Sequence, residues 1–437
     1  MRNRLPFVLL TLLVAGGAFC YGYLAHRHRL FPAGVIHALF GETKTYGSPL
    51  KWGQVEGLPG RWHNPNETGY ETESDTDMLA FAYLTGSNIA PDEKGVTVND
   101  PERAYRGYNL YLSAHGAETF LTDMEGKVLH RWGKRLSEVW PEHASIEGEY
   151  WRRVHLLPNG DLLAIYDGVG MVRLAADSTL AWSYPGKCHH DLDVDAEGRI
   201  HTLAREKQVV PDLDPDREWF EDFIVMLSPD GEELSKFSLY EALRDSKYRP
   251  ILDDIPSVSD FMHTNTIAVL DGSLAEQSPY FAKGNLLVSI LALNTIAIVD
   301  PEERKVVWAL KGLWRRQHEP VLLDSGRILM FENEADTMRS RVFEFDPFTH
   351  EVFWEFTANR NRSFYSKTCG TSHRLPNGNT LIVESDRGRA LELTPDGAVV
   401  WVFVNPHRAG EENELIATLF NIDRLPPDFP VKNFLPD

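Results

Sequence analysis

The stretch that decides the fold is residues 374–403, RLPNGNTLIVESDRGRALELTPDGAVVWVF. Alternating, strand-like runs flank an Asn-Gly and an Asp-Gly dipeptide, and such dipeptides between strands are the strongest short signal for a β-hairpin. The last run carries Trp401. The stretch therefore predicts two consecutive hairpins, which amount to about four short antiparallel strands.

The same pattern recurs along the chain. Turn-centred hairpins recur at 156–167, 193–204 and 322–333, and strands with a tryptophan recur at Trp132, Trp182, Trp308, Trp354 and Trp401. Successive tryptophans are 50, 126, 46 and 47 residues apart. The 126-residue interval accommodates two units, the first with ELSKFSL (233–239) in place of a tryptophan strand and with an insertion. Six units of about four strands are typical of propeller blades.

The two ends of the chain are expected to close the ring. The first unit, residues 108–132, lacks an innermost strand, and the C-terminal run ATLFNIDRLPP (417–427) can supply it. Such pairing removes exposed strand edges. No helical periodicity separates the strands, which disfavours a parallel α/β sheet. We therefore predict an all-β, six-bladed β-propeller over residues 105–437. A pair of β-sandwiches is the alternative, but it leaves the even tryptophan spacing unexplained.

The N-terminus predicts a membrane anchor. Residues 5–25, LPFVLLTLLVAGGAFCYGYLA, carry no charge, and a helix of this length can cross a bilayer core of about 30 Å. No clean cleavage site follows the apolar run, so we expect an uncleaved signal anchor, a transmembrane helix, over residues 1–30. Residues 31–104 are rich in Gly, Pro, Asn and acidic residues and are interpreted as a stalk and surface loops, with one helix near 77–84.

The charge and the cysteines restrict the function further. The net charge of −20 makes the chain a poor nucleic-acid binder, because such binding needs a basic surface. Three cysteines cannot build a disulfide framework. Cys188 and Cys369 are left open as one bridge or as two buried thiols, and no Cys/His spacing fits a zinc site.

Five histidines precede the Gly-turn hairpins at one phase of the repeat: His155, His190, His263, His318 and His373. One phase of a propeller implies one radius and one height, so we expect all five imidazoles near one mouth of the central channel. Imidazoles can exchange protons or act as nucleophiles near neutral pH. Blade packing is the alternative for each of them, most of all for His155. No carboxylate keeps a constant spacing from them, so no metal site is predicted.

Four segments resemble bacterial aryl-sulfate sulfotransferases: HHD (189–191), DFMHTN (260–265), RRQHEP (315–320) and residues 372–401. The similarity covers about residues 105–427 in its blade pattern and is sharpest from 260 onward. The resemblance implies a six-bladed propeller, often exported. Together with the anchor expected from the N-terminus, this predicts a membrane-anchored protein whose soluble domain is periplasmic. The resemblance also implies transfer of a sulfuryl group from a phenolic sulfate ester to a phenol acceptor, with neither a nucleotide donor nor another cofactor.

The resemblance also assigns roles to residues. It implies that His318 is the nucleophile and becomes transiently sulfated. It implies that His263, with Asn265 beside it, and His190 or His189 bind the sulfuryl group or exchange protons, and His190 is preferred. Asp191 could orient one of these rings.

The chain departs from the family at one position. The strand that follows DFMHTN carries an Arg in the family, and matching it to residues 285–300 places Leu291 there. An always-charged, forked guanidinium is a strong partner for an oxyanion, and leucine offers neither charge nor donors. Another cation must therefore replace it, with Arg374, Arg315 and Arg316 as candidates. We accordingly assign substrate binding to His189, Asn265, His373 and Arg374.

Two other functions stay open on sequence grounds. The propeller could be catalytically degenerate and serve as a membrane-anchored binding or accessory subunit with a membrane-protein partner. Leu291, the expected anchor and the acidic composition favour this alternative. A lactonase-like hydrolase is the third alternative, but such enzymes need calcium held by acidic residues, and no such ring is evident.

Overall fold

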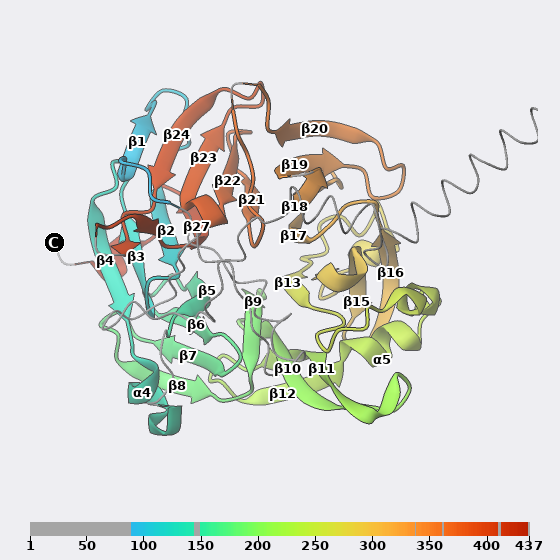
Figure 1. Cartoon of the computed structure of the whole chain (residues 1–437). Coiled ribbons are helices and arrows are strands. Elements are labelled where there is room, and N and C mark those ends of the chain that lie inside the picture. Colours follow the sequence, from blue (N-terminus) through green and yellow to red (C-terminus); the bar gives the residue numbers. More distant parts are fainter. Residues whose placement is uncertain (1–88, 144–148, 337, 361, 410–411, 436–437) are drawn as a thin grey trace, which may run out of the picture. The chain divides into compact units, whose positions relative to one another are not determined.

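The computed structural model describes residues 89–143, 149–336, 338–360, 362–409 and 412–435. Within these residues, six antiparallel sheets stand around a common axis, and Figure 1 shows the first strand of each sheet nearest that axis. The predicted all-β, six-bladed β-propeller is confirmed.

Each blade consists of four strands, named in order from the axis outward. The first three blades are β27 (Leu419–Leu425), β2 (Tyr108–Ser113), β3 (Glu118–Thr122) and β4 (Val128–Gly133); β5 (Trp151–Leu156), β6 (Leu162–Tyr166), β7 (Gly170–Leu174) and β8 (Leu180–Tyr184); and β9 (Cys188–Val194), β10 (Ile200–Val210), β11 (Asp214–Leu227) and β12 (Glu233–Ser238). The last three are β13 (Thr264–Val269), β14 (Leu286–Ile290), β15 (Thr295–Asp300) and β16 (Lys305–Lys311); β17 (Gln317–Leu322), β18 (Ile328–Asp336), β19 (Arg339–Phe345) and β20 (Val352–Thr357); and β21 (Thr371–Arg374), β22 (Thr380–Glu384), β23 (Arg389–Leu393) and β24 (Val399–Val404).

The two ends of the propeller close the ring as expected. β27 pairs antiparallel with β2, from Tyr108 opposite Leu425 to Ser113 opposite Leu419. The innermost strand predicted within residues 417–427 is thus confirmed. β1 (Gly95–Asn99), which lies in the range interpreted as stalk and surface loops, pairs with β24 and adds a fifth, outermost strand to the last blade.

The repeated tryptophans lie in β4, β8, β16, β20 and β24, the fourth strand of five blades. Four of them donate an indole N–H to a carbonyl in a turn of the next blade: Trp132 to Gly160, Trp182 to Pro229, Trp354 to Pro395 and Trp401 to Met124, at 3.0–3.1 Å. The fifth, Trp308, contacts the ring of Phe348 in the following blade. The tryptophans therefore join neighbouring blades, which explains their regular spacing.

Helices are short and lie in connections and insertions: α4 (Leu136–Val139), α5 (Leu239–Arg244), η1 (Pro141–His143), η2 (Arg249–Asp254), η3 (Pro279–Phe281), η4 (Leu291–Leu293), η5 (Ser385–Arg387) and η6 (Val431–Asn433). The expected insertion is the long β10–β11 hairpin together with α5 and η2. Ser238 caps α5, because its hydroxyl accepts a hydrogen bond from the Glu241 amide at 3.0 Å. A small sheet of β25 (Arg408–Ala409) and β26 (Leu415–Ile416) precedes β27.

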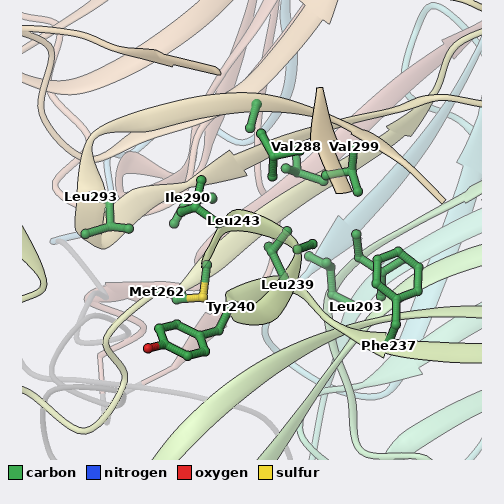
Figure 2. Close-up of a cluster of buried hydrophobic side chains, with 14 of the residues drawn as sticks. Leu203, Phe237, Leu239, Tyr240, Leu243, Met262, Val288, Ile290, Leu293 and Val299 are labelled. Carbon is green, nitrogen blue, oxygen red and sulfur yellow. The ribbon is translucent and has the colours of Figure 1, made fainter. Parts of the chain in front are cut away.

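Apolar side chains fill the spaces between blades. Figure 2 shows the cluster between the third and fourth blades, where Phe237 of β12 packs with Leu239, Tyr240 and Leu243 of α5. Val288, Ile290 and Val299 contribute from the fourth blade. Burial of this apolar surface is the main favourable contribution to joining the two blades.

Cys188 and Cys369 are both buried, and neither is in a disulfide. Of the two open alternatives, the pair of buried thiols is therefore the one observed. No helix within the described residues is long and apolar enough to span a bilayer. The predicted anchor (1–30), Cys20 and the helix expected near 77–84 lie outside the described residues.

Candidate active site

Irregular pairing of the inner strands determines where the candidate residues point. The register between inner and second strands shifts near the start of β5, β9, β13 and β17, and the shifts include Arg152, His190, Asn265 and Glu319. A bulge adds a residue to one strand and redirects its side chain, and bulges are frequent beside active sites. The four consecutive blades therefore aim side chains at the axis that a regular strand would not.

Three residues at these positions have left-handed backbones: His190 (φ 56°), His263 (φ 49°) and Glu319 (φ 48°). This conformation is unfavourable for side chains other than Gly and persists only where surrounding contacts impose it. Its occurrence in three neighbouring blades, at residues that are all buried, makes this end of the channel the candidate site.

His189, His190 and His263 form the first part of the site. His190 and His263 have ring centroids 4.9 Å apart, and the Nδ1 atoms of His189 and His190 are 2.7 Å apart. The Arg205 guanidinium lies 3.3 Å from Nδ1 of His189 and donates to Asp260 at 2.7 Å. Nδ1 of His263 is hydrogen-bonded to the same Asp260 carboxylate. Asp260 therefore joins a guanidinium and an imidazole in a low-exposure environment.

His318 forms the second part of the site. Its Nδ1 lies 2.7 Å from Oδ1 of Asn333 and 3.1 Å from the carbonyl of Arg316. The amide nitrogen of Asn333 donates to the carbonyls of Ser366 and Cys369, so Oδ1 is the Asn333 atom that faces the ring. Both neighbours of Nδ1 are acceptors, and Nδ1 must therefore carry the hydrogen. The lone pair of the neutral ring is then on Nε2.

The rings of His190, His263 and His318 are all buried. Exposed fractions are 3% for His190, 4% for His263 and 3% for His318. Burial lowers the pKa of His318 to about 3, with a further contribution from the Arg152 guanidinium. Burial also lowers the pKa of His190 well below its usual value, and Arg152 and His263 add to the effect. Desolvation disfavours the charged form of imidazole, so the ring of His318 is neutral throughout the physiological range.

The remaining two histidines of the series lie at the other end of the channel. His155 and His373 are the penultimate residues of β5 and β21, next to the turns, whereas His190 and His318 are near the start of their strands and His263 just precedes β13. His155 lines a cavity of about 190 Å³ with Asp193 and Asp423. His373 Nε2 lies 3.8 Å from Asp423. The expectation of five imidazoles at one height was therefore wrong, because the bulges shift three of them relative to the turns.

A buried ion triad separates the two groups of histidines. Arg153 donates to Asp191 at 2.5 Å and to Glu319 at 2.7 Å, and the three residues come from β5, β9 and β17. Asp191 therefore pairs with an arginine and accepts a hydrogen bond from the Ile267 amide. This carboxylate was expected to orient an imidazole ring, and it instead holds an arginine and a backbone amide.

The other sequence-predicted residues have structural partners. Asn265 is buried and donates its amide to the carbonyl of Gln317 at 2.9 Å, which ties the fourth blade to the strand of His318. Arg374 ends β21 beside the turn and is paired with Glu344 of the fifth blade. Arg316 is paired with Glu334 and its side chain is 39% exposed. Arg374 is therefore not a replacement cation for the missing family arginine.

Leu291 was expected on the strand that follows DFMHTN, but it lies in η4, directly after the end of β14. The amide of Leu291 donates to the carbonyl of His263 at 3.3 Å, and the residue is 9% exposed. The backbone next to His263 is thus braced, but no charge is supplied from this position.

Sequence reasoning missed Arg152, Arg205, Asp222 and Asn333. Arg152 and Arg153 stand together in the segment WRRVH, and two arginines in an inner strand were a usable signal. Asp260 was within the quoted DFMHTN motif without being assigned a role. Asn333 has no local signature, because its role depends on the pairing of β17 with β18.

The fold and the site together define a propeller with a neutral, oriented histidine among buried cations and imidazoles at one end of its axis. A family model described as arylsulfotransferase (ASST) matches residues 153–406, more than half of the chain. The chain belongs to this family.

No curated protein matches the chain. Among solved structures, the chain resembles a protein of unknown function from Bacteroides caccae, with 13% identity, a TM-score of 0.49 and coverage of 72% of this chain and 98% of that one. It also resembles a catalytically inactive virginiamycin B lyase from Staphylococcus aureus crystallised with quinupristin, with 10% identity, a TM-score of 0.42 and coverage of 75% and 100%.

Proposed function

We propose that the protein transfers a sulfuryl group from an aryl sulfate to a phenol through a sulfated His318, without a nucleotide donor. The observation that carries the proposal is the 2.7 Å contact between Nδ1 of His318 and Oδ1 of Asn333, both of which are buried. This contact leaves the lone pair on Nε2, and family membership supplies the class of substrate.

In the first half-reaction, Nε2 of His318 attacks the sulfur, and the bond between sulfur and the phenolic oxygen breaks. The developing phenolate takes a proton from Nε2 of a protonated His263, and the phenol leaves. The Asp260 carboxylate accepts from Nδ1 of His263 and so stabilises its imidazolium form. The same arrangement, a buried acid behind an imidazole, is a general means of holding the ring in position.

In the second half-reaction, the acceptor phenol gives its proton to Nε2 of the now neutral His263 while its oxygen attacks the sulfur. The bond between sulfur and Nε2 breaks, and His318 returns to its starting state. His190, kept neutral by burial beside Arg152, binds the sulfuryl oxygens through a ring N–H. A covalent intermediate of this kind predicts ping-pong kinetics.

The test compares His318→Ala with His155→Ala. Both remove one imidazole from an inner strand, but His155 lies at the opposite end of the channel. With a fluorogenic aryl sulfate and a phenol, we expect His318→Ala to lose at least about a thousandfold in kcat/KM, since nucleophile removal is among the largest single losses, and His155→Ala to stay within about twofold of wild type. Mass spectrometry should find sulfate on His318 when donor is supplied alone. Equal activity of the two variants would refute the proposal.

The degenerate alternative is favoured by one observation, the leucine at position 291. In that case the wild type and His318→Ala would be equally inactive, no covalent label would form on His318, and the protein would copurify in fixed stoichiometry with a membrane protein.

A further inference from the structure

Sulfuryl transfer needs a positive charge beside the sulfuryl oxygens, which bear the negative charge of the donor, the intermediate and the product. Fixed donors and cations in a water-poor site are usually the largest electrostatic contribution to such catalysis. Two guanidinium groups act on the histidines of the site, Arg205 and Arg152. The inference below, which concerns the arginine that binds the sulfuryl oxygens, rests on the proposed function.

Arg205 is already neutralised. Its Nη1 donates to Asp260 at 2.7 Å, and its Nε lies 3.9 Å from Asp222. Its Nη2 points to the Nδ1 atoms of His189 and His190, at 3.3 and 3.5 Å. Its donors are therefore directed at a carboxylate and two rings of the protein.

Arg152 is different. It is 6% exposed, and within the described parts of the chain its guanidinium forms no ion pair and its Nε has no hydrogen-bond partner. Its guanidinium stacks over the Phe420 ring at 4.8 Å. Asp167 acts on it electrostatically, but from beyond the 4.0 Å of an ion pair. A buried cation without a paired anion is unfavourable, which points to a ligand that supplies the anion.

The position of Arg152 suits that ligand. It lies in the register shift near the start of β5. His190 and His318 occupy the corresponding end of the inner strands β9 and β17. The charge of Arg152 influences both of those rings, as the lowered pKa values of His318 and His190 show. Because Arg152 stands at the start of β5, and His190 and His318 stand near the start of β9 and β17, an anion bound to it would lie at the end of the channel that holds these two rings.

We propose that Arg152 binds the sulfuryl oxygens and replaces, from the second blade, the family arginine that is missing from the fourth. The ligand is an aryl sulfate or the sulfo-histidine formed from it. The guanidinium fork donates two N–H groups to two oxygens, a geometry that lysine cannot reproduce.

Inorganic sulfate is the probe, because its binding requires no covalent step. Isothermal titration calorimetry would compare the wild-type full chain with Arg152→Met and Arg152→Lys. We expect sulfate affinity to fall about ten- to hundredfold in Arg152→Met, the loss expected for charge-assisted hydrogen bonds, and by a smaller factor in Arg152→Lys. kcat/KM for an aryl sulfate should fall in parallel.

Arg153→Lys is the matched control, since Arg153 is the adjacent buried arginine but is paired with Asp191 and Glu319. It should keep wild-type sulfate affinity. If Arg152→Met does not fold, judged by circular dichroism, Arg152→Lys against Arg153→Lys decides. Wild-type affinity in the Arg152 variants, or no sulfate binding by the wild type, would overturn the inference. Titrating His318→Ala separates the two proposals, because sulfate binding should persist there even if the transfer mechanism fails.

Discussion

At the scale of single residues, the amide of Asn333 decides what His318 can do. Because its nitrogen donates to two backbone carbonyls, its oxygen must face the imidazole and accept from Nδ1. The tautomer of His318 is thus fixed by the loop at residues 366–369, which belongs to the connection leading to the next blade.

Replacing Asn333 with Asp should move the pH dependence of the reaction. A carboxylate beside Nδ1 favours the imidazolium, so the pKa of His318 should rise from about 3. The imidazolium has no lone pair on Nε2, and kcat/KM should therefore fall at a higher pH than in the wild type. We expect the acid limb to move up by at least about one pH unit. A pH profile of kcat/KM measures this.

Asn405→Asp is the control for that experiment. Asn405 is also buried and uses its amide nitrogen to hold a backbone carbonyl, that of Ala417, but it lies outside the histidine cluster. Its variant should lose comparable stability with an unchanged pH profile. An unshifted acid limb in Asn333→Asp would contradict the proposed role of the Asn333 oxygen.

The histidines themselves were within reach of sequence reasoning, since HHD, DFMHTN and RRQHEP are compact motifs around His190, His263 and His318. The WRRVH segment signals two arginines in an inner strand, but which of them is left without an ion pair depends on the register shift at Arg152 and could not be predicted. A cation that comes from a different blade cannot be found by comparing the position of the family arginine, where this sequence has Leu291.

At the scale of strands and blades, local signals predicted most of the fold. Each hairpin depends on a turn dipeptide and on alternation, and five of the six blades carry a tryptophan in their fourth strand, so these units could be counted from their own residues. The third blade lacks the tryptophan and was inferred from the 126-residue interval. Height along the axis was not predictable in this way. A bulge has no fixed local signature, and the bulges near the start of β9 and β17 place His190 and His318 at the end of the channel opposite His155.

The tryptophan contacts predict a stability effect with the site left intact. Trp401 is fully buried and donates to Met124 of the first blade. Trp401→Phe removes that hydrogen bond and leaves a small void, which should cost about 1–3 kcal/mol. Urea unfolding measures the loss, and kcat/KM should stay within about twofold of wild type.

Trp354→Phe serves as the comparison, because its indole makes the same type of bond, to Pro395, at a more exposed position. Its loss should be under about 1 kcal/mol, since water can satisfy the carbonyl. A larger loss for Trp354→Phe than for Trp401→Phe would show that the buried indole bond does not join the blades as described.

At the scale of the whole molecule, we propose that residues 1–30 anchor the propeller to a membrane with the propeller on the periplasmic side. The support is the uncharged run at residues 5–25, which is long enough to cross a bilayer. The closure of the ring could also be predicted from the sequence. The first unit lacks an innermost strand, and residues 417–427 can supply it, as β27 does.

The anchor predicts a fractionation result. The full chain should sediment with membranes and resist extraction by alkaline carbonate. Alkaline carbonate removes proteins that are held by charge, but it does not extract an apolar helix from the bilayer. A variant lacking residues 1–30 should appear in the soluble fraction with unchanged kcat/KM. External protease should reach the propeller in spheroplasts but a cytoplasmic marker should stay protected. Full-length protein in the soluble fraction would contradict the anchor, and protection of the propeller would contradict the orientation.

The ion pairs of Arg153 with Asp191 and Glu319 affect how substrates could enter and leave the channel. They join the inner strands of three blades across the middle of the channel. For the transfer that we propose, this means that donor and acceptor use the same mouth of the channel, so the first phenol leaves before the second binds. Storing the sulfuryl group on His318 would bridge that interval.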